Sequence, residues 1–393
     1  MLVLTEALLT LVSVALLVPV VVLAAEVFLA RDLARSYDGQ QKPRPRVAVL
    51  IPAHNEAAGI AATIRSVVAQ TGPSDRVLVV ADNCTDQTAA VALTAGAHVI
   101  ERADPERRGK GFALDHGVSH LATDPPDFVI VVDADCEVRP GSLDQLVWAS
   151  LSSGRPTQAL DLMVEEGGAR SVRSFAWILK NQVRPLGLRR AGLPCQLMGT
   201  GMAFPWEMIR RAKLASGALV EDVKLGLELA VAGTPPLFCP SALVVSKFPQ
   251  SQEGAAAQVT RWEHGHLALI LREVPRLIVQ SVLKRSPSLA VMALDVSVPP
   301  LSLLVLLLLA VLLAAIAYSW ATGRIASSVM VSGLGLAMTV LALARAWGRF
   351  GRQAMSPRDV GLLVLYGARK VPVYVRFLVA RQGQWIRTKR HDR

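Results

Sequence analysis

Three long uncharged stretches constrain the fold of this chain more than any other feature. They span residues Ala7–Ala25, Val296–Trp320 and Ile325–Ala344, and each is close to the ~20 residues that a helix needs to cross about 30 Å of hydrocarbon. The hydrophobic content of 52% and the mean hydropathy of +0.39 are also high for a soluble protein. We therefore predict three transmembrane helices, with a long polar region between the first and the second.

The cations beside these stretches predict how the chain is oriented. No Lys or Arg precedes the first stretch, so we expect a retained anchor and not a cleaved signal peptide. Membrane proteins carry their excess of cations on the cytoplasmic side. The relevant cations follow the first stretch, precede the second and follow the third: Arg31, Arg35, Lys42, Arg44 and Arg46; Lys284 and Arg285; Arg345, Arg349 and Arg352. We predict an integral protein of the cytoplasmic (inner) membrane whose polar region is cytoplasmic and whose only far-side loop is residues 321–324.

The net charge of +11 has a similar explanation. Lys and Arg gather beside the apolar stretches and in the tail, residues 387–390, and such clusters bind anionic lipid headgroups. Membrane lipids, and no nucleic acid, are therefore the expected partners. The four cysteines include no Cys-x-x-Cys pair, which indicates neither a zinc site nor a disulfide framework.

The first part of the polar region alternates between strand-like and helical patterns. Four runs are apolar on both faces, as in the strands of a covered parallel sheet: residues 47–51, 76–80, 98–100 and 128–132. Helical patterns separate these runs, over about residues 57–70, 85–95 and 111–121. The sequence thus predicts an α/β half-domain of the nucleotide-binding kind.

The rest of the polar region is less regular. Residues 151–250 carry many turn signals and predict an α+β substrate half. Residues 255–285 and 360–380 mix apolar positions with cations, a pattern typical of helices in the membrane interface rather than of a fourth span. The predicted parts begin with an anchor over residues 1–30 and a cytoplasmic catalytic domain over 45–255. Interfacial helices follow over 256–290, and two transmembrane helices over 296–344. A basic interfacial or cytoplasmic segment over 345–393 ends the chain.

Acidic side chains follow the predicted strands, at the edge where open α/β sheets bind ligands. Asp133-Ala134-Asp135 closes the fourth run, and its carboxylates could hold a divalent metal on a diphosphate. Glu56 and Asp82 follow the first and second runs and could contact a nucleoside. Asn83 or Thr85 could cap the next helix while Asp82 points into the crevice. The alternatives are a solvated turn for the triplet and a helix cap for Glu56.

Two further groups of polar residues could contact phosphates or act as a base. The loop 107–111 combines Arg107, Arg108 and Lys110 with two glycines, which suits a loop near phosphates, although it lacks the Walker spacing and could be a solvated basic turn. Glu221 and Asp222 begin a predicted helix, where acids also complement the helix dipole.

A third group lies on one helical face. Gln258 and Arg261 are three residues apart, with Trp262 beside them. Arg261 could bind a phosphate through two bonds, and Trp262 could stack on a sugar ring or anchor the helix at the membrane interface.

In this order the residues resemble a known signature. Asp82, Asp133-x-Asp135, Glu221-Asp222 and Gln258-x-x-Arg261-Trp262 are similar to the D, DxD, ED, QxxRW motifs of membrane-bound family 2 glycosyltransferases, over about residues 47–265. That family includes cellulose, chitin, hyaluronan and poly-N-acetylglucosamine synthases and ceramide glucosyltransferases. The resemblance implies a GT-A fold, a UDP-sugar donor, and Mg²⁺ or Mn²⁺ as the cofactor.

The resemblance also implies a role for each motif. Asp82 would contact the uridine, Asp133 and Asp135 the diphosphate and its metal, with Asp135 the more direct ligand. Asp222 would be the catalytic base of an inverting transfer. Lys110 would help to neutralise the leaving group, and the last motif would hold the diphosphate and the acceptor: Gln258, Arg261 and Trp262. Gly199-Thr200-Gly201 resembles the family's turn near the acceptor.

Departures from the signature leave the acceptor open. The usual Asp-Asp-Gly-Ser reads Ala81-Asp82-Asn83-Cys84, so one acid is missing, and only two clear spans follow residue 290, too few for a polymer channel within one chain. We expect transfer to a growing polysaccharide or exopolysaccharide, with export partners as possible companions. The alternatives are a single transfer to a ceramide- or polyprenyl-type lipid, and a non-catalytic subunit that binds nucleotide sugars.

Overall fold

The structure is a computed structural model that describes residues 2–31, 43–249 and 251–380. Arg35, Lys42 and the basic tail lie outside the described residues. The chain forms two compact units: one comprises Met1–Arg31, Ala169–Ala191 and His266–Gln382, and the other Asp32–Gly168, Gly192–Gly265 and Gly383–Arg393. We call the first the helical unit and the second the sheet unit.

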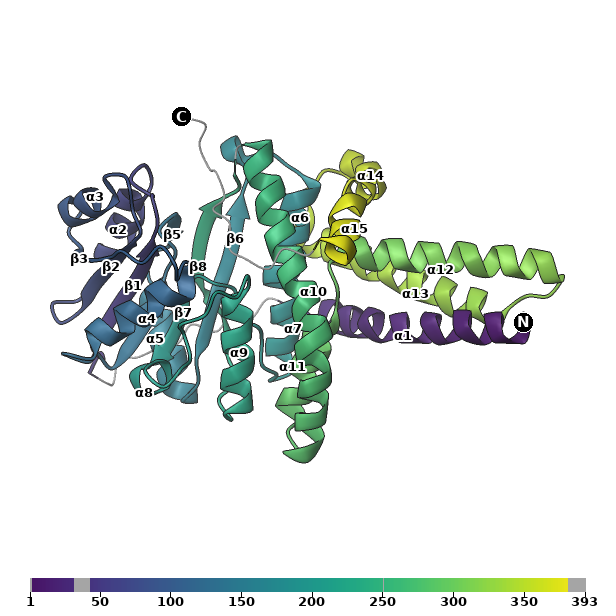
Figure 1. Ribbon diagram of the computed structural model, residues 1–393, viewed down its shortest axis with the longest axis horizontal. Coiled ribbons are helices and arrows are strands. Elements are labelled where there is room, and N and C mark those ends of the chain that lie inside the picture. The colour runs from purple at the N-terminus through teal and green to yellow at the C-terminus, as the bar shows by residue number, and fades with distance from the viewer. Residues whose placement is uncertain (1, 32–42, 250, 381–393) are drawn as a thin grey trace. The chain divides into compact units, whose positions relative to one another are not determined.

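The sheet unit is built on one eight-stranded sheet with the order β3-β2-β1-β4-β7-β6-β8-β5 (Figure 1). The strands are β1 Val47–Ala53, β2 Arg76–Asp82, β3 His98–Arg102, β4 Phe128–Val131, β5 Cys136–Val138, β6 Thr157–Val164, β7 Met202–Pro205 and β8 Leu237–Lys247. The first four strands in this order are parallel, whereas β7 is antiparallel to both of its neighbours and β5 is antiparallel to β8. The four predicted apolar runs are therefore four neighbouring parallel strands of the sheet, and β6 and β8 form a further parallel pair.

Alternating side chains of β1 explain why both faces of the sheet are covered. Val49 and Ile51 pack on one side and Ala48 and Leu50 on the other, and all four are fully buried. The first face is covered by α2 Ile60–Val68, α3 Thr88–Thr94 and α5 Ser142–Ser153, and the second by α4 Lys110–Leu121, α8 Trp206–Ile209 and α9 Glu221–Val231. The α/β fold class predicted from the sequence is confirmed.

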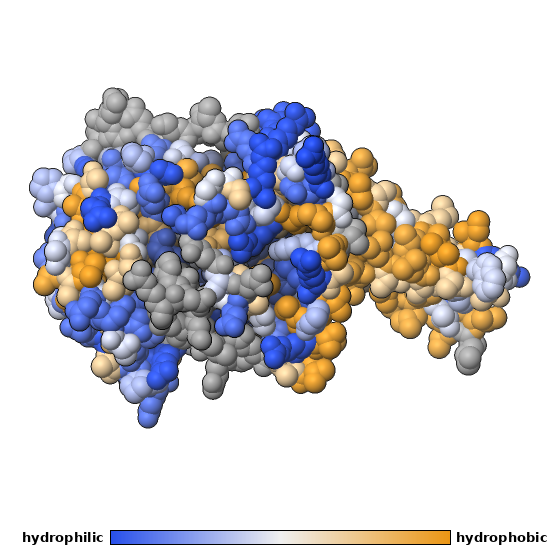
Figure 2. All heavy atoms as spheres, turned by 90° about the horizontal axis from the view of Figure 1, so that it is seen from above, coloured by the Kyte–Doolittle hydropathy of each residue, from blue (hydrophilic) through white to orange (hydrophobic). Residues whose placement is uncertain are grey.

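The helical unit contains the three predicted apolar helices. They are α1 Leu2–Leu29, α12 Leu301–Thr322 and α13 Ser327–Ala346, and they lie side by side with an almost wholly apolar surface (Figures 1 and 2). Among the described residues, these are the three helices long and apolar enough to cross a membrane. The second span starts later than Val296, because α11 Pro287–Ser297 ends just before Pro299 and Pro300, which cannot donate helical hydrogen bonds.

Helices also form at the two places where the sequence shows an interfacial pattern. The pattern over 255–285 is one long helix, α10 Gln252–Leu283, whose first part belongs to the sheet unit. The pattern over 360–380 forms two short helices, α14 Leu362–Ala368 and α15 Val371–Val379. The helical unit also includes α6 Val172–Ile178, a π-helical turn Leu179–Val183, and α7 Arg184–Arg190.

A buried cation holds three helices of the helical unit together. Arg184 on α7 donates from Nε to Glu26 on α1 at 2.5 Å and from Nη2 to Asp295 on α11 at 2.6 Å. The three side chains are 10%, 3% and 5% exposed. Beside them, a Cβ on Gly187 would lie 1.9 Å from the carbonyl oxygen of Glu26, so α7 and α1 meet backbone to backbone. We call these three residues the Arg184 triad.

Candidate active site

The predicted polar turns meet because their strands are parallel neighbours. The strand β1 pairs with β2 on one side and β4 on the other, so all three end at the same edge of the sheet. His54 Nδ1 lies 2.7 Å from the carbonyl oxygen of Asp82, and the side-chain oxygen of Asn55 accepts the N–H of Thr85 at 2.6 Å. Glu56 lies in the same turn, where its N–H donates to Thr88 Oγ1 at 2.8 Å.

Asn83 and Thr85 do not cap α3, and Glu56 is not the N-cap residue of α2. The helix α3 begins after Gln87, and the side chain that receives the N–H of Thr88 is Asp86, at 3.0 Å, rather than Asn83 or Thr85. The helix α2 begins after Gly59 without a side-chain cap. The carbonyl of Glu56 accepts the N–H of Gly59 at 3.0 Å, so its backbone starts that turn.

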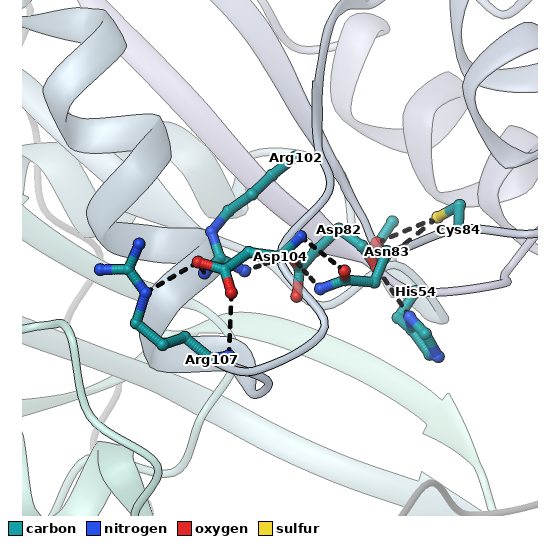
Figure 3. A network of polar contacts seen from close by, with 8 residues as sticks. His54, Asp82, Asn83, Cys84, Arg102, Asp104 and Arg107 are labelled. Carbon is teal, nitrogen blue, oxygen red and sulfur yellow. Dashed lines mark hydrogen bonds and ion pairs between the residues drawn. The ribbon is translucent and has the colours of Figure 1, made fainter.

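Asp82 belongs to a network of charges at the end of β2 (Figure 3). Its Oδ1 accepts bonds from Arg102 at 2.6 Å and from the amide of Asn83 at 2.9 Å. Arg102 also pairs with Asp104 at 3.1 Å, and Asp104 receives the Nε–H of Arg107 at 2.7 Å. Asp82 therefore lies at the carboxyl end of the sheet, as predicted, but as part of an ion-pair chain that the sequence did not reveal.

Asp133 and Asp135 fit a divalent cation. The N–H of Asp133 donates to Thr200 Oγ1 at 3.1 Å, and Thr63 Oγ1 donates to the carbonyl of Ala134 at 2.8 Å, which fixes the turn between the two acids. Asp133, Asp135 and Cys136 offer ligand atoms within 4.8 Å of one another. Burial raises the pKa of the Cys136 thiol well above its ordinary value, so the carboxylates are the hard donors that suit Mg²⁺ or Mn²⁺.

Lys110 connects this acidic turn to the loop 107–111. It is the first residue of α4, pairs with Asp133 through a short contact, and donates to the carbonyl of Gly199 at 2.6 Å. Burial would lower the pKa of Lys110, but the charges of Asp133 and Glu221 outweigh it and raise that pKa. Lys110 therefore stays positively charged, at a position where a bound diphosphate would need a cation.

Gly199 marks the point where three predicted site residues converge. A Cβ there would lie 3.3 Å from Asp222 Oδ2, 3.6 Å from Lys110 Nζ and 3.9 Å from Asp133 Oδ2. The residue has a φ of 96°, which L side chains rarely adopt. The weak Gly-x-Gly signal of the sequence thus lies at the centre of the candidate site.

Replacing Gly199 by Ala should impair the site without unfolding the sheet. The backbone strain costs on the order of 1–3 kcal/mol, and the new methyl group would crowd Asp222, so we expect kcat to fall on the order of 10²-fold. The matched control is Gly96→Ala, which has nearly the same φ of 97° but meets no atom within 4 Å. If both variants lose the same activity, strain and not crowding is responsible.

Glu221 and Asp222 open α9, as predicted. Lost hydration and the charge of Asp222 raise the pKa of Glu221 to about 7, against the lowering effects of Lys110 and Arg261. The Glu221 carboxyl therefore changes charge near neutral pH, beside the residue expected to act as a base. Two acids that only complement a helix dipole would not need to be buried beside each other and beside Lys110.

This pKa predicts a pH-dependent stability in the absence of metal and nucleotide. Between pH 4.5 and about 7 the folded chain keeps a proton on Glu221 that the unfolded chain releases. The free energy of unfolding should therefore fall as pH rises through this window and level off above it. Chemical denaturation at several pH values checks this, and Glu221→Gln should flatten the curve. An unchanged slope in that variant would show that Glu221 does not titrate there.

The third predicted group reaches the same place from α10. Gln258 is buried, at 4% exposed, and Arg261 and Trp262 are half-buried. A Cβ on Gly265 would lie 3.0 Å from Val220, the residue before Glu221, so α10 packs directly on the start of α9. The charge of Arg261 acts on Glu221. Arg261 therefore lies close enough to the start of α9 for its charge to act there.

Sequence reasoning missed Arg102 and, although it noted the turn Gly199-Thr200-Gly201, it missed the contact that Thr200 makes in the site. Arg102 is the register partner of Asp82 in the β2–β3 pair, and Thr200 holds the backbone of Asp133. A signal for Arg102 was available, because both residues end neighbouring parallel strands. Thr200 comes from a distant loop, so only tertiary structure could reveal its role.

Residues 43–265, more than half of the chain, match the family described as Glycosyltransferase like family 2. The chain belongs to this family. A Bacillus subtilis relative named Probable glycosyltransferase YdaM is 28% identical over 258 residues, which cover 59% of this chain and 57% of the relative. The uncharacterized glycosyltransferase Rv0539 of Mycobacterium tuberculosis is 31% identical over 195 residues, or 46% of this chain and 85% of that one. This family 2 glycosyltransferase thus spans little more than half the length of the Bacillus relative.

Two further proteins are informative. The 4,4'-diaponeurosporenoate glycosyltransferase of Staphylococcus aureus is 40% identical over 90 residues, 22% of this chain and 23% of the relative. A solved mannosyltransferase from Pyrobaculum calidifontis, in complex with GDP-mannose and Mn²⁺, has a TM-score of 0.53 at 18% identity and covers 95% of this chain and 100% of its own. The family 2 glycosyltransferase has the GT-A fold that the sequence resemblance implied.

Proposed function

We propose that this family 2 glycosyltransferase moves a sugar, with inversion, from a UDP-sugar to a growing polysaccharide at the cytoplasmic membrane face. The convergence of Asp222, Lys110 and Asp133 around Gly199 carries the proposal. With the proposed roles, a base, a cation and a metal-binding acid would lie within reach of one donor. The GT-A fold supports a nucleotide-sugar donor. The cations beside the apolar helices support a catalytic domain on the cytoplasmic side of the membrane.

The donor would lie along the carboxyl ends of β1, β2 and β4. Asp82 and Glu56 would contact its nucleoside, and Asp133 and Asp135 would hold a divalent cation against its diphosphate. When bound, that cation supplies charge neutralisation. Lys110 and Arg261 add two protein cations on the leaving-group side, and Gln258 and Trp262 would complete the contacts to the diphosphate and the acceptor sugar.

The transfer step needs a proton acceptor opposite the leaving group. Asp222 would take the proton of the acceptor hydroxyl while that oxygen forms a bond to C1 of the sugar. The bond between C1 and the diphosphate oxygen breaks in the same step, and UDP leaves with the electron pair. A positioned general base contributes typically ~10²–10⁴-fold.

Arg261→Lys tests the leaving-group contact. A guanidinium can give two parallel bonds to a phosphate, whereas an ammonium is a point charge. We expect kcat/KM for the UDP-sugar to fall at least about tenfold, which corresponds to one lost charged bond of about 1.5–3 kcal/mol. Steady-state kinetics check this. Wild-type turnover would mean that Arg261 serves the membrane interface instead.

A lipid acceptor is the second candidate, and two observations favour it. Within the described residues three helices can cross a membrane, too few for a polymer channel within one chain. One matching relative is named for transfer to 4,4'-diaponeurosporenoate. In this case the enzyme would add one sugar to a ceramide- or polyprenyl-type molecule.

A donor screen in native membranes tests both candidates. Membranes with the full chain receive mass-tagged UDP-glucose, UDP-galactose, UDP-N-acetylglucosamine or UDP-glucuronate, and products are separated by size. Long labelled chains support the polysaccharide, and a single added sugar in the lipid extract supports the lipid. UDP binding without turnover of any donor would indicate a non-catalytic subunit. Membranes with Asp222→Asn serve as the background.

A further inference from the structure

The charge network around Asp82 determines how that carboxylate can accept bonds. An ionised carboxylate oxygen has about two lone-pair sites. The Oδ1 of Asp82 already accepts from Arg102 and Asn83, at 2.6 and 2.9 Å. Both lone-pair sites of this oxygen are therefore occupied, and Oδ2 is the oxygen left for a ligand.

Arg102 is held so firmly that it will keep this oxygen occupied. Its side chain is 10% exposed, and that of Asp82 is 8% exposed. Its other guanidinium nitrogen pairs with Asp104 at 3.1 Å, and its guanidinium lies 5.6 Å from the ring centre of Phe112 on α4. A charged bond in such a buried place is worth more than one in water.

The same network reaches the loop that precedes Lys110. Asp104 receives the N–H and the Nε–H of Arg107, at 3.0 and 2.7 Å. The N–H of Asp104 donates to Asn83 Oδ1 at 2.8 Å (Figure 3). Arg102 thus joins the nucleoside end of the site to the phosphate-side loop.

We propose that Arg102 is a positioning residue that limits Asp82 to one acceptor oxygen and thereby selects uracil over guanine in the donor. Uracil presents a single N–H between two carbonyl groups, which one oxygen can satisfy. Guanine presents two adjacent donors, N1–H and N2–H, which match both oxygens of a free carboxylate. A guanine here would leave one buried donor without a partner, which lowers affinity. This inference rests on the proposed function, because it assumes a nucleoside diphosphate at this edge of the sheet.

Binding of UDP and GDP to the full chain, with Mn²⁺ in detergent, tests the inference. We expect the wild type to prefer UDP at least about tenfold. Arg102→Met should weaken UDP binding about tenfold or more and bring the ratio of the two affinities close to one. The matched control is Arg46→Met, which removes an exposed ion pair with Asp124 beside the start of β1 and should change neither affinity.

The outcomes separate this inference from the proposed function. Equal losses of UDP and GDP binding in Arg102→Met would mean that Arg102 only supports the fold, and a wild type that prefers GDP would also overturn the selection. A wild type that binds neither nucleotide would contradict the proposed function itself. If Arg102→Met does not fold, Asp104→Ala replaces it, because it frees Arg102 from its second anchor. It should shift the UDP to GDP ratio in the same direction, and an unchanged ratio there would overturn the inference.

Discussion

Asp222→Asn should reduce sugar transfer by about 10²–10⁴-fold while UDP binding stays nearly unchanged. The amide keeps the size of the side chain at the start of α9 but cannot take up a proton. Its partner variant is Asp135→Ala, which should weaken UDP binding in the presence of Mn²⁺, since a metal ligand is lost. The two acids would thus separate into one that acts on kcat and one that acts on donor affinity.

Turnover and equilibrium binding of UDP, measured on the same preparations, distinguish these roles. The matched control is Asp115→Asn, an exposed residue on α4, which should behave as the wild type. Equal losses of UDP affinity in Asp222→Asn and Asp135→Ala would contradict the division of roles. Full turnover in Asp222→Asn would remove the base from the mechanism.

Arg184→Met should cost the helical unit about 3–5 kcal/mol of stability. The substitution leaves Glu26 and Asp295 buried without their cation, and removing one member of a buried charge cluster is far more harmful than losing a surface pair. Thermal or denaturant unfolding of the detergent-solubilised protein measures the loss. The exposed Arg276 pairs with the half-buried Glu273 at 3.3 Å and provides the control Arg276→Met, which should cost about 1 kcal/mol or less.

A triple variant separates charge from packing in the Arg184 triad. Combining Arg184→Met with Glu26→Gln and Asp295→Asn removes all three charges, so much of the lost stability should return. If the triple variant is as unstable as Arg184→Met, lost packing and not an uncompensated charge is the cause. If Arg184→Met is as stable as Arg276→Met, the triad contributes little.

Strands β1, β2 and β4 could be predicted because they are apolar on both faces. Phe128–Val131 is buried throughout, and the acids that follow it had to leave the core at the carboxyl edge. The convergence of Asp82 with Asp133 then follows from the pairing of β1 with β2 and β4. These placements needed only local patterns and the geometry of parallel strands.

Contacts between distant segments could not be predicted in the same way. Gly199 gave a weak turn signal, and its place among Asp222, Lys110 and Asp133 depends on how four separate segments pack. The Arg184 triad was equally hidden, because its members are separated by more than a hundred residues along the chain. Ion pairs of this kind leave no periodic pattern in a sequence.

The central claim is that Asp133, Asp135 and Lys110 make one donor site. Linked binding of Mn²⁺ and UDP tests this claim most directly. Electron paramagnetic resonance of the full chain titrated with Mn²⁺, with and without UDP, measures both partners at once. We predict one bound Mn²⁺ per chain whose affinity rises with UDP, and loss of this linkage in Asp135→Ala. Equal UDP binding in Mn²⁺ and in chelator, in both the wild type and Asp135→Ala, would contradict the account.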